Sequence, residues 1–196
     1  MRISRYRINA PVHMRVAVVA DLHGRPTEAL YQALKAEQPD IILIPGDLAT
    51  VGEYDDCIID PERREKRLRT QKGALDFLHA AVTIAPTFYS RGNHEWASSE
   101  DEYFRAVRET GVVLLENRWA EHNGIFIGGQ NSAEYDAYCD GKKKSPEKKH
   151  PKTEWLQHDI PEGYKILLCH HPEYYDFVEP YADCILCGHT HGLSGL

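Results

Sequence analysis

Seven residues that could bind metal ions follow short apolar stretches of this 196-residue sequence: Asp21, His23, Asp47, Asn93, His170, His189 and His191. Their side chains offer carboxylate oxygens, imidazole nitrogens and one amide oxygen, without any thiolate. Such mixed nitrogen and oxygen donors suit Mn, Fe, Zn or Ni. The first prediction is therefore a metal centre.

Six apolar stretches are predicted to be buried strands: Val16–Ala20, Ile41–Ile44, Thr87–Ser90, Ile125–Gly128, Ile166–Cys169 and Cys184–Cys187. Five of these six stretches lead directly into one or two of the metal-capable residues. Ligands of an open α/β sheet bind beyond the carboxyl ends of its strands. The seven side chains are therefore expected to converge on one edge of the fold.

Helices are predicted between the first three strands, at Pro26–Glu37 and Glu65–Val82. This alternation implies right-handed crossovers and a parallel start to the sheet. A third helix, Glu100–Thr110, is predicted to end at Gly111. The stretches Val112–Glu116, Trp119–His122 and Ile125–Gly128 are expected to be neighbouring strands, with a tight turn at Asn123-Gly124.

Five short motifs occur in a characteristic order: Asp-x-His at residue 21, Gly-Asp at 46, Gly-Asn-His-Glu at 92, a lone strand-end His170, and Gly-His-x-His at 188. This set resembles the calcineurin-like metallophosphoesterases, and most closely the bacterial single-domain members. The resemblance spans residues 21–191. It implies an α/β fold with a two-sheet β-sandwich flanked by helices, a single domain over residues 1–196, and an extra N-terminal strand at Ile3–Ile8.

The resemblance also assigns the ligands of two divalent cations. One cation is expected on Asp21, His23, Asp47 and His191, and the other on Asp47, Asn93, His170 and His189, with Asp47 as the bridge. The implied reaction is hydrolysis of a phosphomonoester or phosphodiester by a hydroxide bound to both metals. The metal could be Mn, Fe, Zn or Ni.

Two further residues receive catalytic roles. His94 is expected to stay off the metals and to protonate the leaving oxygen as a general acid. Arg91 is a candidate phosphate clamp, because a guanidinium group matches two phosphate oxygens. An arginine before Gly-Asn-His-Glu is typical of protein Ser/Thr phosphatases, but residues 48–52 lack the second arginine of that group.

Three alternatives to a small-molecule phosphoesterase stay open: a nuclease, a nucleotide-sugar pyrophosphatase, and a non-catalytic scaffold that retains metals. A net charge of −7 gives nucleic acid no general attraction, and only the stretch Asp140–Lys152 is concentrated in basic residues. A small phosphorylated substrate is therefore preferred over nucleic acid. The scaffold is disfavoured because the chain keeps every ligand and His94.

Two residues near the motifs are expected to have structural roles. His171 should point away from the metals, because adjacent residues on an extended strand face opposite sides. Glu95 should orient its loop or cap the next helix.

The remaining features concern location and assembly. No apolar run approaches the ~20 residues of a membrane span, no signal peptide is visible, and five scattered cysteines suit a reducing compartment, so the cytoplasm is expected. The sequence ends at Leu196, and Leu193 stands where the family usually has a second glycine. One hypothesis is that the sheet lacks C-terminal strands and exposes an edge at Cys184–Cys187 through which copies self-associate. The alternatives are a fragment whose missing tail stabilises the fold and a naturally short chain whose N-terminal segment covers the edge.

Overall fold

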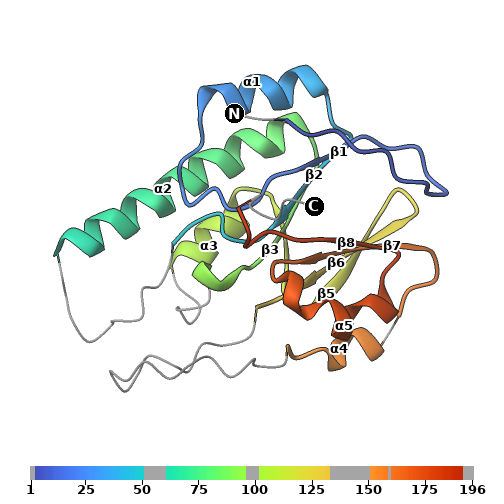
Figure 1. Ribbon diagram of the computed structural model, residues 1–196. Helices are drawn as coiled ribbons and strands as arrows, with labels where there is room; N and C mark the ends of the chain where they lie inside the picture. Colours follow the sequence, from blue (N-terminus) through green and yellow to red (C-terminus); the bar gives the residue numbers. More distant parts are fainter. Residues whose placement is uncertain (1–2, 51–60, 96–101, 133–150, 159, 192–196) are drawn as a thin grey trace.

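The fold was analysed in a computed structural model that describes residues 3–50, 61–95, 102–132, 151–158 and 160–191. Two four-stranded sheets face each other (Figure 1). The first sheet has the order β1-β2-β3-β4, and all of its neighbouring strands are parallel. These strands are β1 (Val16–Val18), β2 (Ile41–Pro45), β3 (Thr87–Ser90) and β4 (Val113–Leu115).

The second sheet has the order β5-β6-β7-β8. Only β5 and β6 are antiparallel, and they are joined at Asn123 and Gly124, which both adopt positive φ as the predicted tight turn requires. The strands are β5 (Arg118–His122), β6 (Ile125–Gln130), β7 (Tyr164–Cys169) and β8 (Cys184–Leu186).

Helices cover the outer face of each sheet (Figure 1). The first sheet is covered by α1 (Glu28–Glu37), α2 (Pro61–Ile84) and α3 (Glu102–Glu109). The second sheet is covered by α4 (Glu154–Gln157) and α5 (Tyr175–Val178), with short 3-10 turns η3 (Pro172–Tyr174) and η4 (Glu179–Tyr181) beside α5. A further 3-10 turn, η1 (Asn93–Glu95), follows β3.

Strand β2 shows how the sequence produces this layering. Ile42 and Ile44 belong to the core under the helices, whereas Ile41 and Leu43 belong to the core between the sheets. Successive side chains of a strand point to opposite faces, so a strand buried on both faces must be apolar at every position. The predicted two-sheet sandwich flanked by helices is confirmed.

Two predictions about elements are wrong. Ile3–Ile8 is not a strand, and Tyr6 in this segment is 87% exposed. The segment is tied instead to α1 by the Arg5–Glu37 ion pair. Strand β4 pairs with β3 in the first sheet, so it is not a neighbour of β5 in a common sheet.

The second sheet ends at β8 within the described residues, and no strand described here pairs with the outer edge of β8. Residues 192–196 and most of the basic stretch at 140–152 lie outside the described residues. No helix in the described part of the chain is both long and apolar enough to cross a membrane.

Candidate metal centre

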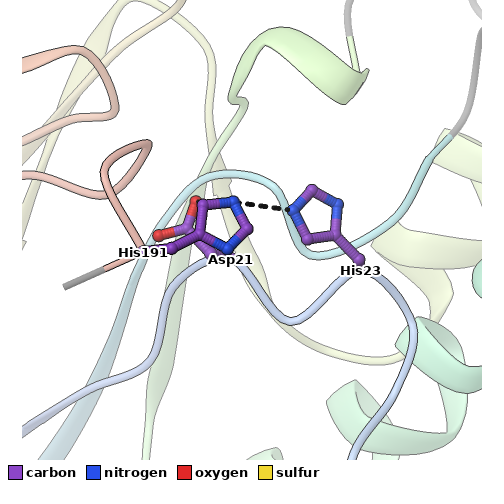
Figure 2. A group of neighbouring side chains, drawn as sticks. All are labelled: Asp21, His23 and His191. Atoms are coloured by element: carbon purple, nitrogen blue, oxygen red, sulfur yellow. Dashed lines mark hydrogen bonds and ion pairs between the residues drawn. The ribbon is translucent and has the colours of Figure 1, made fainter. Parts of the chain in front are cut away.

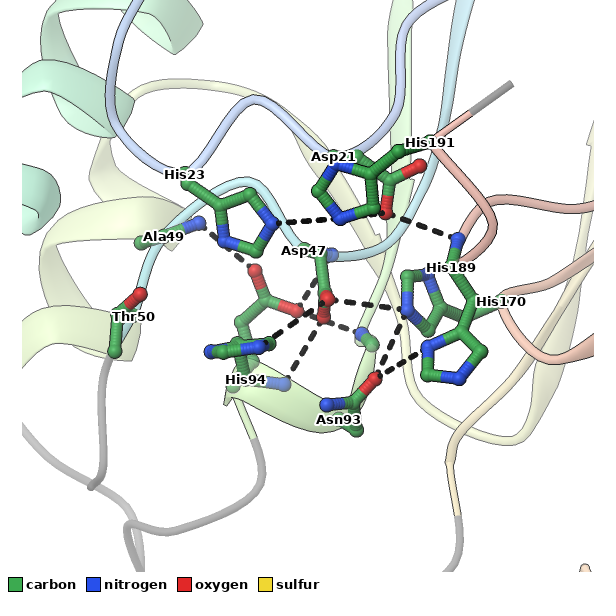
Figure 3. A network of polar contacts seen from close by, with 12 residues as sticks. Asp21, His23, Asp47, Ala49, Thr50, Asn93, His94, His170, His189 and His191 are labelled. Atoms are coloured by element: carbon green, nitrogen blue, oxygen red, sulfur yellow. Dashed lines mark hydrogen bonds and ion pairs between the residues drawn. The ribbon is translucent and has the colours of Figure 1, made fainter. Parts of the chain in front are cut away.

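All seven residues predicted to bind metal lie together where strands of both sheets end (Figure 3). Asp21 and His23 follow β1, Asp47 follows β2 and Asn93 begins η1 after β3. His170 follows β7, and His189 and His191 follow β8. The site is therefore shared between the two sheets, and its side chains come from five strand ends.

One group of donor atoms comprises Asp21, His23 and His191 (Figure 2). The Nε2 atoms of His23 and His191 lie 3.4 Å apart, and Nε2 of His191 lies 4.0 Å from Oδ1 of Asp21. Oδ1 of Asp21 also accepts a hydrogen bond from the backbone N–H of His189 at 2.9 Å. That hydrogen bond joins the segment after β1 to the segment after β8.

The second group surrounds Asp47 and Asn93. Nε2 of His170 lies 3.1 Å from Oδ2 of Asp47 and 3.1 Å from Oδ1 of Asn93, and Nδ1 of His189 lies 3.0 Å from the same amide oxygen. His170 donates its Nδ1–H to the carbonyl oxygen of Pro45 at 2.9 Å. This hydrogen bond turns Nε2 toward Asp47 and Asn93 as the nitrogen that could bind a cation, which is how proteins orient a metal-binding histidine.

The spacing of these atoms fits cations. Two ligand atoms bound at about 2.1 Å and at right angles are roughly 3.0 Å apart. The separations of 3.0 and 3.1 Å around Asn93 and Asp47 match this value. Lone pairs of oxygen and nitrogen that face one another at such distances repel unless a proton or a cation lies between them. The donor sets therefore suit divalent metal ions.

Five of the predicted ligands have unusual backbone geometry. Asp21, His23, Asp47, His189 and His191 all have φ between 46° and 69°. This left-handed region is uncommon for residues other than glycine, and residues held there cluster at functional sites. Among the described residues with positive φ other than glycine, only three lie elsewhere: Gln38, Asn117 and Asn123.

A model of the calcineurin-like phosphoesterases matches residues 14–193. The chain belongs to the calcineurin-like phosphoesterase family. It is also 24% identical to an uncharacterized metallophosphoesterase of Aquifex aeolicus (strain VF5), over 98% of this chain and 70% of that protein. Members of this family generally bind divalent metals and hydrolyse phosphoesters, and the two donor groups agree with that activity.

His94 lies at the open side of this phosphoesterase site. Its backbone N–H donates to Oδ1 of Asp47 at 3.0 Å, and its Nε2 lies 3.9 Å from Oδ2 of Asp47. The side chain keeps 42% of its surface exposed. His23, Asp47 and His94 also form a third cluster of possible ligand atoms, so its position suits either a ligand or a proton donor. The general-acid role stays a prediction.

Arg91 is engaged elsewhere. Its guanidinium group pairs with Glu116 and lies 3.6 Å from the centre of the Phe104 ring. Glu116 also accepts a hydrogen bond from Arg108 at 2.8 Å. A phosphate group would have to compete with Glu116 for this arginine, so the contacts favour a structural role over the predicted phosphate clamp.

His171 does not turn away from the site as expected. Its ring centre lies 4.3 Å from that of His189, and its Nδ1 lies 3.7 Å from Oε2 of Glu173. Burial, followed by the neighbouring His170 and His189, lowers the pKa of His171 to about 4. The expectation failed because β7 ends at Cys169, so the strict alternation of a strand no longer applies at His171.

Burial and neighbouring charges shift the pKa values of three candidate ligands. Burial raises the pKa of Asp47, but the hydrogen bond and charge of His170 outweigh this effect and hold its pKa below the usual range. Burial likewise lowers the pKa of His170, yet the hydrogen bond with Asp47 prevails and raises it. Burial lowers the pKa of His23, and the charge of His94 adds to the effect, so the imidazole is neutral at neutral pH. A cation would displace the proton that His170 and Asp47 favour.

Proposed function

We propose that this chain hydrolyses a phosphomonoester or phosphodiester bond of a small phosphorylated molecule, with two divalent cations held by the seven residues. The observation that carries the proposal is the position of Asp47. Its carboxylate is within ligand distance of His23 on one side and of His170 and His189 on the other. One carboxylate that reaches both donor groups is what a shared, bridging ligand requires.

The charge of the donor set supports an anionic substrate. Two carboxylates, Asp21 and Asp47, would face two divalent cations, so the centre would stay positive and attract phosphate. When bound, the cations would polarise the phosphoryl oxygens and lower the pKa of coordinated water from 15.7 toward about 7. Mn, Fe, Zn and Ni all suit these donors.

The remaining roles belong to side chains at the open face of the site. We assign His94 as the general acid that protonates the leaving oxygen, because its ring is partly exposed next to Asp47 while its backbone is fixed by the Asp47 carboxylate. General acids contribute roughly 10²–10⁴-fold to the rate. We place the reaction in the cytoplasm, which the free thiols of Cys169, Cys184 and Cys187 favour.

The test is a panel of substrates given to metal-free protein and to protein reconstituted with Mn²⁺. The panel contains p-nitrophenyl phosphate, bis(p-nitrophenyl) phosphate, an alkyl phosphate, a nucleotide sugar and a single-stranded oligonucleotide. We expect turnover of small phosphoesters that requires added metal. Turnover confined to the oligonucleotide or to the nucleotide sugar would favour the nuclease or the pyrophosphatase, and cation binding without any turnover would favour the scaffold.

A further inference from the structure

Glu95 is a fully buried carboxylate that accepts three hydrogen bonds from the backbone. Its side chain is 0% exposed. Oε2 accepts the N–H of Asp47 at 2.9 Å and the N–H of Gly92 at 2.7 Å, and Oε1 accepts the N–H of Ala49 at 2.9 Å. Asp47 and Ala49 belong to the segment after β2, and Gly92 belongs to the segment after β3.

These two segments carry Asp47, Asn93 and His94, and they are in direct contact. A Cβ atom on Gly92 would lie 2.2 Å from Oδ1 of Asp47 and 2.6 Å from the Asp47 nitrogen. The spacing leaves no room for the segments to move toward each other, and the hydrogen bonds to Glu95 oppose their separation. The carboxylate therefore fixes the distance between the segments that present the candidate ligands.

The three donors use both oxygens of the side chain as acceptors. A carboxylate has two oxygens that both accept, whereas a carboxamide has one oxygen and an NH₂ group that can only donate. In the place of Glu95, a glutamine would set its NH₂ against at least one backbone N–H.

We propose that Glu95 is a positioning residue that raises the affinity of the site for both cations. It does so by holding Asp47 and Asn93 in ligand geometry. This inference rests on the proposed function, since it assumes that Asp47 and Asn93 bind metal. It predicts that both cations weaken together when Glu95 is changed, because Asp47 would serve both.

The experiment compares Mn²⁺ binding by wild type, Glu95→Gln and Glu95→Asp, using isothermal titration calorimetry of the metal-free proteins. Residues behind metal ligands typically change affinity by about 10–100-fold, and we expect losses in that range for both cations in Glu95→Gln. Glu95→Asp keeps the charge but shortens the reach, so we expect a fold that is retained and a loss of at least about 10-fold. If Glu95→Gln fails to fold, Glu95→Asp decides.

The matched control is Thr70→Val. Thr70 is buried and its hydroxyl bonds to the backbone of Thr50, so it anchors the segment after β2 through hydrogen bonds that involve none of the seven candidate ligands. We expect this variant to lose stability but to keep its Mn²⁺ affinity. Unchanged Mn²⁺ affinity in both Glu95 variants would overturn the inference. So would a loss of Mn²⁺ affinity in Thr70→Val as large as that in a Glu95 variant with the same free energy of unfolding. Tight binding by wild type without turnover would overturn the proposed function and leave this inference standing, whereas no binding by wild type would refute both.

Discussion

Aspartate and histidine at the candidate metal centre adopt backbone conformations that cost free energy. A residue other than glycine in the left-handed region costs of order 1–3 kcal/mol, and Asp21, His23, Asp47, His189 and His191 all lie there. Short turns of this kind aim side chains two residues apart toward the same point. The strain is therefore tolerated because the resulting geometry brings the donor atoms together.

Removing Asp47 should abolish both cation sites. In Asp47→Ala, each donor group loses the carboxylate that it shares with the other, so we expect metal content to fall from two equivalents to nearly none. Metal analysis after gel filtration measures this. Asp76→Ala is the control, because Asp76 is exposed on α2 and pairs with Lys72, outside the candidate metal centre. Two tightly held ions in Asp47→Ala would contradict the shared role of Asp47.

Removing the His94 ring should separate binding from catalysis. In His94→Ala we expect two metal ions and a stable fold, with kcat on an alkyl phosphate reduced by ~10²-fold or more. The loss should be smaller on p-nitrophenyl phosphate, whose leaving group needs little protonation. His79→Ala, an exposed position on α2, is the control. Equal losses on both substrates would argue against a general acid, and loss of metal would identify His94 as a ligand.

At the scale of elements, α2 supports the segment that carries Asp21 and His23. The helix meets this segment at two glycines, and a Cβ atom on Gly73 would lie 2.1 Å from the carbonyl oxygen of Gly24. Backbone contacts this close cannot be relieved by turning a side chain. The position of α2 therefore determines the position of one donor group.

Substituting Gly73 tests this support. Alanine favours a helix by up to about 1 kcal/mol over glycine, but overpacking costs about 1–3 kcal/mol, so Gly73→Ala should be destabilising. We expect a lower free energy of unfolding in urea and weaker binding of the cation at Asp21, His23 and His191. The second cation should be less affected. Lys72→Ala, at an exposed neighbouring position, should change neither quantity.

Several elements and candidate ligands could be predicted because the signals were local. Thr87–Ser90 was predicted with its observed bounds, and the other predicted strands differ at their ends. The prediction of burial was wrong for β1 and β8, which are only partly buried. The sequence indicates the left-handed turns at the ligands less clearly than it indicates the strands. The signs are glycines such as Gly46 before Asp47 and Gly188 before His189.

Features that depend on tertiary contacts could not be predicted. The family resemblance implied a strand at Ile3–Ile8, but Arg5 pairs with Glu37 on α1, and the segment pairs with no sheet strand among the described residues. Arg91 pairs with Glu116 and lies over the Phe104 ring, and both partners are distant from it in the sequence. The three backbone donors around Glu95 likewise come from two segments. Only the Gly-Asn-His-Glu motif hinted that Glu95 mattered.

At the scale of the whole molecule, β8 offers a free edge within the described residues. Its residues are partly buried and apolar, and an exposed edge of this kind can pair with another chain. We propose that copies of this chain associate through β8.

Sedimentation velocity over a hundredfold concentration range should show a shift from monomer to dimer, which Ile185→Lys should weaken. Ile160→Lys, at an exposed apolar position outside β8, should leave the shift unchanged, and a monomer at every concentration would refute the proposal.

The division of the site between the two sheets also has a consequence for synthesis on the ribosome. Asp21, His23, Asp47 and Asn93 are translated well before His170, His189 and His191. At ribosomal rates of about 5–20 residues per second, the early ligands wait several seconds for their partners. The full donor set of either cation is therefore complete only after β7 and β8 have been made and the second sheet has docked. Cation loading would follow the docking of the two sheets and could not guide the first sheet toward its fold.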